Sequence, residues 1–356
     1  MKALKKTSLN KLMILILIQF FAVALIVWIF DPFYQYHAPF FHMEAVLNDR
    51  DNQMPGTIRN FDYDSVLVGS SVAENFDSSF LDEAYDCRTL KIIRASGSLA
   101  DLNYYLDMAQ EERELRNVFW CLDIFAVSSD LEVTLYGEDI PRYLHTETVL
   151  DDLPYLYNKE ILLEKIPYML ACSAQRINTG GQAYNWSRGK EFSAEQSMRF
   201  YERDAAGPDT IVPQKDFSER VALIEQNVAL LREQIQSHPD TDYYILLPPY
   251  SMLWWDCAYL NGELEERFYI LERLMSTLPD CENVKLYFFQ NESDIVCNLD
   301  NYMDMIHYSP GMNQFMLDKM AADENRVTKE NRQMLLEDMR ALTEHIEKEE
   351  IYRYYH

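Results

Sequence analysis

The sequence predicts an α/β protein with one N-terminal transmembrane helix, followed by a three-layer sandwich around a central parallel sheet of about five strands. Two observations lead to this prediction. One long apolar run lies near the N-terminus, and beyond it short strand-like apolar segments alternate with longer segments of helical spacing. Parallel strands need crossover helices between them, and these helices cover both faces of the sheet.

The apolar run from Met13 to Phe30 predicts the membrane anchor. Roughly eighteen residues at about 1.5 Å each nearly match a hydrocarbon core of about 30 Å. Four lysines precede the run and no Lys or Arg follows it before Arg50, so residues 1–12 are expected in the cytoplasm and the rest outside the cell. The alternative is a signal peptide cleaved near Ala22-Val23-Ala24. The run continues past that point, which favours an uncleaved, single-pass anchor in the cell membrane.

The composition argues against several functional classes. The formal net charge of −26 disfavours binding to nucleic acid or to an anionic lipid surface. The six cysteines are scattered and form no Cys-x-x-Cys pair, so no metal site is predicted. The chain has no glycine-rich loop of the phosphate-binding kind, and no cofactor is expected.

The domain that follows the anchor and a neck over residues 31–60 is expected to span residues 61–324. Its strand-like segments are residues 65–70, 89–95, 117–125, 242–247 and 284–289. Its helical segments are residues 99–113, 217–237, 264–278 and a helix that Ser309-Pro310 opens with an N-cap hydroxyl and a first-turn proline. Functional sites in such folds lie beyond the carboxyl ends of the strands.

Two segments depart from this alternation. Residues 126–216 are rich in scattered aromatic and charged residues and are interpreted as an insertion after the third strand. The insertion is either a lid or substrate-binding wall, or packing decoration of the domain. Residues 325–356 are predicted to form a charged C-terminal helix with little apolar surface, which is either solvated or docked on the domain.

Two short motifs carry the candidate chemistry. Gly69-Ser70-Ser71 ends the first strand and places a hydroxyl on a tight turn. Asp304 stands three residues before His307, after the last predicted strand. A serine nucleophile, an imidazole base and a carboxylate that orients the imidazole make up a catalytic triad, so we expect Ser71, His307 and Asp304 to meet at one sheet edge.

Together these motifs resemble the SGNH/GDSL hydrolase superfamily. Gly69-Ser70-Ser71 stands where that family has Gly-Asp-Ser, which implies that Ser71 is the nucleophile and its N–H an oxyanion donor. The segment Arg94–Ser98 stands where the family places a second donor, which implies that role for the Gly97 N–H. The resemblance departs at Asp123, because the family has an asparagine after the third strand. An ionised Asp123 cannot donate a hydrogen bond and would repel an oxyanion.

The anchor makes the resemblance more specific. The chain looks like the membrane-anchored proteins that act in D-alanylation of teichoic acids and O-acetylation of exported polysaccharides. This implies serine-dependent acyl transfer or acyl-ester hydrolysis on a cell-surface glycan, with a membrane-bound acyltransferase as partner. The alternative is a non-catalytic member that keeps the fold and acts as a glycan-binding or assembly protein. Asp123 favours that alternative, and the Ser71/His307/Asp304 set opposes it.

Overall fold

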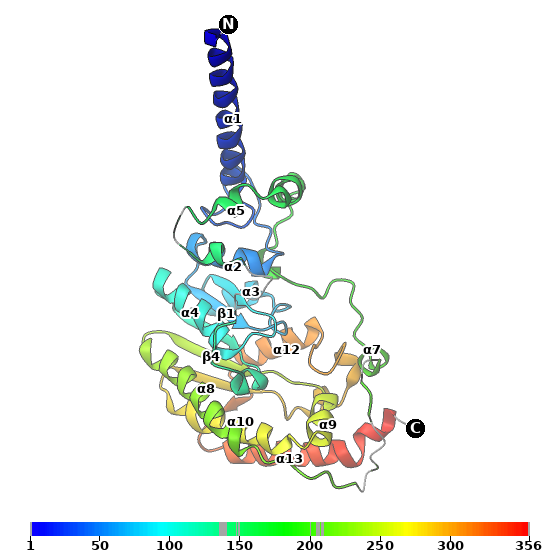
Figure 1. Cartoon of the computed structure of the whole chain (residues 1–356). Helices are drawn as coiled ribbons and strands as arrows, with labels where there is room; N and C mark the ends of the chain where they lie inside the picture. Colours follow the sequence, from blue (N-terminus) through cyan, green and yellow to red (C-terminus); the bar gives the residue numbers. More distant parts are fainter. Residues whose placement is uncertain are drawn as a thin grey trace. The chain divides into compact units, whose positions relative to one another are not determined.

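The computed structural model describes residues 2–134, 141–146, 148, 150–199, 201–203, 207 and 210–354, with side chains from Leu9 onward. Parts of the predicted insertion (135–140, 147, 149, 200, 204–206 and 208–209), of the N-terminal tail (Met1) and of the C-terminal segment (355–356) lie outside the described residues. The chain forms two compact units (Figure 1). The anchor unit comprises Met1–Phe61 and Tyr136–Gly180, and the sheet unit comprises Asp62–Leu135 and Gly181–His356. The predicted insertion is therefore divided between them.

The anchor unit begins with the helix α1, Lys2–Phe30. Its segment Leu9–Phe30 is long and apolar enough to cross a membrane, a property that a signal sequence shares. Only 6% of the most apolar 18 residues of this segment are buried. The unit's other helical segments are α2 (Arg50–Asn60), a 3₁₀ turn (Arg142–His145), α5 (Leu153–Leu156), a π-helical turn (Ile161–Lys165) and α6 (Ile166–Ala174). Its small core consists of Val27, Phe33, Leu144, Tyr155, Ile161 and Ile166.

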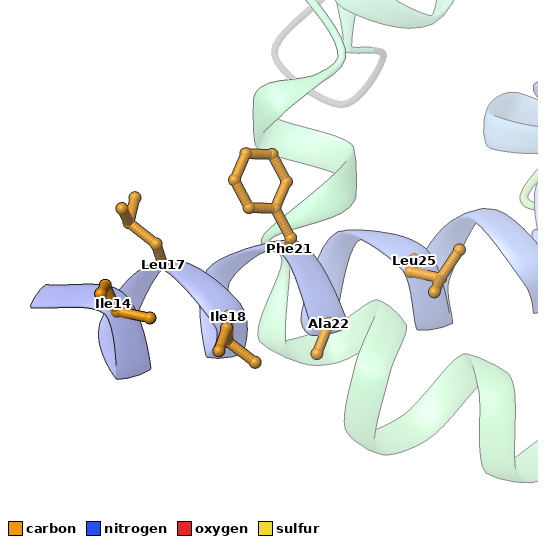
Figure 2. Close-up of a pocket in the computed structure, with 6 residues that line it drawn as sticks. All are labelled: Ile14, Leu17, Ile18, Phe21, Ala22 and Leu25. Carbon is orange, nitrogen blue, oxygen red and sulfur yellow. The ribbon is translucent and has the colours of Figure 1, made fainter. Parts of the chain in front are cut away.

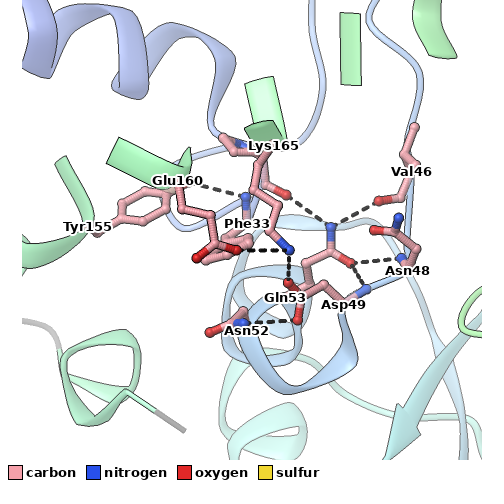
Figure 3. A network of polar contacts seen from close by, with 10 residues as sticks. Phe33, Val46, Asn48, Asp49, Asn52, Gln53, Tyr155, Glu160 and Lys165 are labelled. Carbon is pink, nitrogen blue, oxygen red and sulfur yellow. Dashed lines mark hydrogen bonds and ion pairs between the residues drawn. The ribbon is translucent and has the colours of Figure 1, made fainter. Parts of the chain in front are cut away.

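A polar network holds the neck of the anchor unit together (Figure 3). The Gln53 amide donates to the Pro32 and Val46 carbonyls, at 3.0 and 2.9 Å, and its oxygen accepts from two backbone N–H groups. Lys165 pairs with Asp49 at 2.7 Å. The Gln53 bonds stay within the predicted neck, and the Lys165–Asp49 pair joins the neck to part of the predicted insertion.

The sheet unit contains six strands in the order β2-β1-β3-β4-β5-β6, the first five parallel and β6 antiparallel. The strands are β1 (Ser65–Gly69), β2 (Thr89–Ile93), β3 (Asn117–Cys121), β4 (Asp242–Leu247), β5 (Val284–Phe288) and β6 (Arg326–Val327). Five parallel strands were predicted, and β6 is additional. The strand β3 ends four residues earlier than predicted, because the chain after Asp123 turns into a 3₁₀ helix, η1 (Ile124–Ser128).

Helices connect the strands as the alternation predicts. The α-helices of the sheet unit are α3 (Ser78–Tyr85), α4 (Leu99–Glu112), α7 (Ala194–Met198), α8 (Ser218–Ser237), α9 (Met252–Leu260), α10 (Leu264–Thr277), α11 (Ser293–Val296), α12 (Pro310–Ala321) and α13 (Arg332–Lys348). Further 3₁₀ turns are Gly180–Gln182, Leu278–Asp280, Leu299–Asn301 and Glu350–Tyr354. The register pairs Gly69 with both Ile93 and Cys121, so the carboxyl ends of β1, β2 and β3 are level with one another.

The C-terminal segment differs from its prediction in two ways. Its helix α13 begins only at Arg332, because Arg326–Val327 pairs with β5 as a strand. The helix also has an apolar face, on which Met339, Leu342 and Ile346 are buried. This face packs on α9 and α10, so of the two alternatives the docked helix is the one observed.

Candidate active site

The turn after β1 presents Ser71 at the carboxyl edge of the sheet. A Cβ atom on Gly69 would lie 2.6 Å from the Ala73 Cβ and 3.0 Å from the Cys121 carbonyl oxygen, so only glycine fits between the strand and the turn. The Ala73 N–H donates to the Ser70 carbonyl at 2.9 Å and closes the turn. Ser70 is buried and Ser71 is partly exposed, so Ser71 is the hydroxyl that a substrate can reach.

A tight loop after β5 carries Asp304 and His307. Tyr302 and Tyr308 form an antiparallel bridge at its base, and the Met303 N–H donates to the His307 carbonyl at 3.0 Å. Ser251, at the start of α9, holds the tip, since both its N–H and its hydroxyl donate to the Met305 carbonyl, at 3.0 and 2.8 Å. Hydrogen bonds therefore hold the loop at its base and at its tip.

The structure brings the three predicted triad residues together. The Ser71 Oγ lies 2.9 Å from the His307 Nε2, across 236 residues of sequence. The His307 Nδ1 lies 2.7 Å from the Asp304 Oδ2. The other Asp304 oxygen accepts the backbone N–H groups of Ile306 and His307, at 2.9 and 2.8 Å. The Ser71–His307 and His307–Asp304 distances are both short enough for proton transfer.

These bonds decide the charge of Asp304. Burial alone would raise its pKa, but the hydrogen bond and charge of the His307 ring and the two backbone N–H bonds outweigh burial and hold the pKa below the ordinary value. The carboxyl is thus ionised at neutral pH. It then accepts the Nδ1–H and leaves Nε2 free to accept the Ser71 proton.

Trp186 completes the surroundings of the triad and was not singled out from the sequence. Its Nε1 donates to the Ser71 carbonyl at 3.0 Å, and its ring packs edge-on against the His307 ring at 5.3 Å. The Asn75 oxygen accepts the N–H groups of Trp186 and Ser187, at 3.1 and 3.2 Å. Asn75 therefore positions the segment that carries Trp186.

A buried lysine links the turn that follows Ser71 to the segment that carries Trp186. Lys91, on β2, donates to the carbonyls of Glu74 and Ala183, at 2.9 Å each. Burial lowers the pKa of Lys91 to about 7, although Asp77 and Glu74 act in the opposite direction. Lys91 thus ties the turn after Ser71 to the segment before Trp186, and neither bond can be read from spacing in the sequence.

The triad opens into a small pocket of about 260 Å³. Its lining residues are Ser71, Glu74, Trp186, Lys190, Met303, Asp304 and His307. The volume is slightly below that of a typical drug-sized ligand site, about 300–1,000 Å³.

The two other predicted site residues have partners of their own. The Gly97 N–H donates to the Arg94 carbonyl at 2.9 Å, within the turn that precedes α4. A Cβ atom at Gly97 would lie 2.7 Å from the Arg94 Cγ, so the glycine is needed for that turn. Among the described residues, the Ser71 N–H has no hydrogen-bond acceptor. Of the two backbone donors expected for an oxyanion hole, only the one at Ser71 remains open in this conformation.

Asp123 lies beneath the site and is fully buried. The Tyr250 hydroxyl donates to its carboxyl group. Burial raises the pKa of Asp123 to about 6, against the effects of nearby Ser70, Tyr250 and His307. Asp123 is not among the residues that line the pocket, so the third-strand position lies outside it.

Comparison with models of known protein families gives no match for this chain, and comparison with curated proteins gives none either.

Proposed function

We propose that this protein catalyses serine-dependent acyl transfer or acyl-ester hydrolysis through Ser71, His307 and Asp304. One observation supports the proposal above all others: two segments 236 residues apart place the Ser71 Oγ 2.9 Å from an imidazole nitrogen. The other nitrogen of that ring meets a carboxylate at 2.7 Å. The chain of three groups follows the order nucleophile, base and orienting acid.

In the proposed reaction, the Ser71 Oγ attacks the carbonyl carbon of an ester while His307 Nε2 takes the hydroxyl proton. The imidazolium that forms is stabilised by Asp304, and the developing oxyanion by the Ser71 N–H. The C–O bond to the alcohol then breaks, and His307 returns the proton to the leaving alcohol. In the second half, water or a glycan hydroxyl attacks the acyl-Ser71 ester and gives its proton to His307. The acyl–Oγ bond then breaks, and His307 returns the proton to the Ser71 Oγ.

We infer a cell-surface polysaccharide or teichoic acid as substrate and an SGNH/GDSL-type three-layer fold. The helix Leu9–Phe30 is long and apolar enough to tether the enzyme at a membrane, and the small pocket beside Ser71 suits a short acyl group. We infer the glycan substrate and a membrane-bound acyltransferase partner from the resemblance to the anchored members of that family, which rests on Gly69-Ser70-Ser71 and Asp304-x-x-His307.

A specific observation favours the alternative of a non-catalytic glycan-binding or assembly protein. The Gly97 N–H is taken up by the Arg94 carbonyl, and a buried Asp123 stands in place of an amide donor. An oxyanion would then have fewer donors than a standard esterase offers, and losing one donor costs about 10²- to 10³-fold in rate.

Labelling with a fluorophosphonate separates these functions, because its phosphorus is attacked only by an activated serine. We expect the full-length protein in detergent micelles to be labelled, and both Ser71→Ala and His307→Ala to abolish labelling. The control Ser237→Ala, which removes an exposed hydroxyl at the end of α8, should label like the unchanged protein. An unlabelled wild-type protein with native tryptophan fluorescence would instead favour the binding protein.

A further inference from the structure

The anchor unit exposes apolar side chains well beyond the span of α1. Leu153, Leu163, Tyr168 and Leu170 are 47%, 68%, 52% and 41% exposed. All four lie between Leu153 and Ala174, which comprise α5, the π-helical turn and α6. We call this stretch the juxtamembrane segment.

The helix α6 lacks the polar face of a surface helix. Its sequence from Ile166 to Ala174 contains no charged residue, and it buries Ile166, Met169 and Cys172 on one side. The other side exposes Leu170 and Ala174. A helix that is apolar all round is covered by protein or by lipid, because water on such a face is unfavourable.

Contacts with α1 place the juxtamembrane segment at membrane depth. The Tyr157 hydroxyl donates to the Phe20 carbonyl at 3.2 Å, and the two rings stack at 4.1 Å. Phe20 lies ten residues before Phe30, the end of the span, which is about 15 Å along the helix. The Tyr157 ring therefore lies beside a part of α1 that is about 15 Å from its Phe30 end.

The body of the segment lies nearer to the surface. Ile161 and Ile166 pack with Val27 in the core of the anchor unit, and Val27 is three residues, or about 5 Å, inside the Phe30 end. Lys165, between them, pairs with Asp49 at 2.7 Å and with Glu160 at 3.8 Å. These charged groups would keep the segment near the lipid headgroups. Amphipathic interfacial helices lie at such a depth, with the apolar face about 5–10 Å into the boundary between headgroups and acyl chains.

The side chains of α1 supply the matching lipid-facing surface. Figure 2 shows the face formed by Ile14, Leu17, Ile18, Phe21, Ala22 and Leu25, with the ribbon of the juxtamembrane segment beside the helix. Leu17 and Phe21 are 52% and 66% exposed. Exposed apolar side chains thus occur both on the span and on the segment that packs beside it, and one occupant suits both parts.

We propose that the juxtamembrane segment is a second membrane-contacting element, whose exposed apolar face lies among lipid acyl chains in the leaflet that meets the Phe30 end of α1. The occupant is the lipid that already surrounds the span. The protein is then held by a helix that crosses the membrane and by a helix that lies in its surface.

Spin labelling of the full-length chain in phosphatidylcholine vesicles tests this proposal. Single labels at Leu163→Cys and Leu170→Cys are compared in a background in which the half-buried Cys257 and Cys297 are serine. Collisions with oxygen, which concentrates in lipid, are measured against collisions with a water-soluble nickel chelate. Leu17→Cys gives the reference for lipid, and Glu337→Cys on α13 gives the reference for water.

We expect both labels in the segment to show the oxygen preference of the Leu17→Cys label. A preference for the nickel chelate, like that of Glu337→Cys, would overturn the proposal. Shielding from both reagents would also overturn it, since protein and not lipid would then cover the face. Two independent exposed positions guard against one substitution that disturbs the fold.

Discussion

Replacing Asp304 with asparagine is expected to lower kcat/KM for p-nitrophenyl acetate by about 10⁴-fold, the loss seen when a triad carboxylate becomes an amide. One Asp304 oxygen accepts the Ile306 and His307 N–H groups. The asparagine oxygen takes over that position and keeps the loop folded. The amide NH₂ then faces His307 Nδ1, so the ring proton moves to Nε2, which can no longer accept the Ser71 proton.

The matched control for this prediction is Asp294→Asn. Asp294 is an exposed carboxylate at the start of α11, between β5 and the triad loop. Its replacement should leave kcat/KM within about twofold, because surface substitutions rarely change a site. A loss of less than about tenfold in Asp304→Asn, with the fold intact, would show that His307 does not depend on Asp304 and that the triad is not the catalytic unit.

The replacement of Asp123 by asparagine should remove a pH dependence of stability. The pKa of Asp123 in the folded protein is about 6, above the ordinary value near 3.9. Protonated Asp123 therefore contributes its full stabilisation of the fold below about pH 4, and this stabilisation is lost as the pH rises through about 6. The difference of about two pKa units corresponds to about 3 kcal/mol at pH 7. Asparagine resembles the neutral acid and still accepts the Tyr250 hydroxyl.

We therefore expect Asp123→Asn to match the unchanged protein in free energy of unfolding at pH 4 and to exceed it by about 3 kcal/mol at pH 7. Urea titrations followed by tryptophan fluorescence measure this, since Trp120, Trp186, Trp254 and Trp255 all lie in the sheet unit. Asp294→Asn should show no such divergence. A constant difference at all pH values would mean that Asp123 keeps one charge state throughout.

The alternation of apolar segments was sufficient to predict that β1 to β5 exist, because each is a short, largely buried apolar run, although the end of β3 was placed four residues too late. The meeting of Ser71 with His307 follows from the same pattern, since carboxyl ends of parallel strands share one edge. The short strand β6 was missed because two residues, Arg326 and Val327, carry no periodicity. The apolar face of α13 was underestimated, although Met339, Leu342 and Ile346 follow helical spacing.

Other features depend on contacts that no local pattern encodes. Trp186 reaches the Ser71 carbonyl from 115 residues away, and the Lys91 ammonium is buried by residues from two distant segments. The engagement of Gly97 N–H by Arg94 depends on the backbone of a single turn. The division of residues 126–216 between two units likewise depends on tertiary packing, although one of its boundaries falls at the adjacent glycines Gly180 and Gly181.

Mass spectrometry detects most directly whether Ser71 carries the acyl group. The full-length protein is incubated with p-nitrophenyl acetate, quenched in acid and digested, and the modified peptide is sequenced. We predict an acetyl ester on Ser71 that accumulates in the wild-type protein and is absent from Ser71→Ala and His307→Ala. An acetyl group on another residue, or turnover of the ester with Ser71 unmodified and dispensable, would show that Ser71 is not the nucleophile.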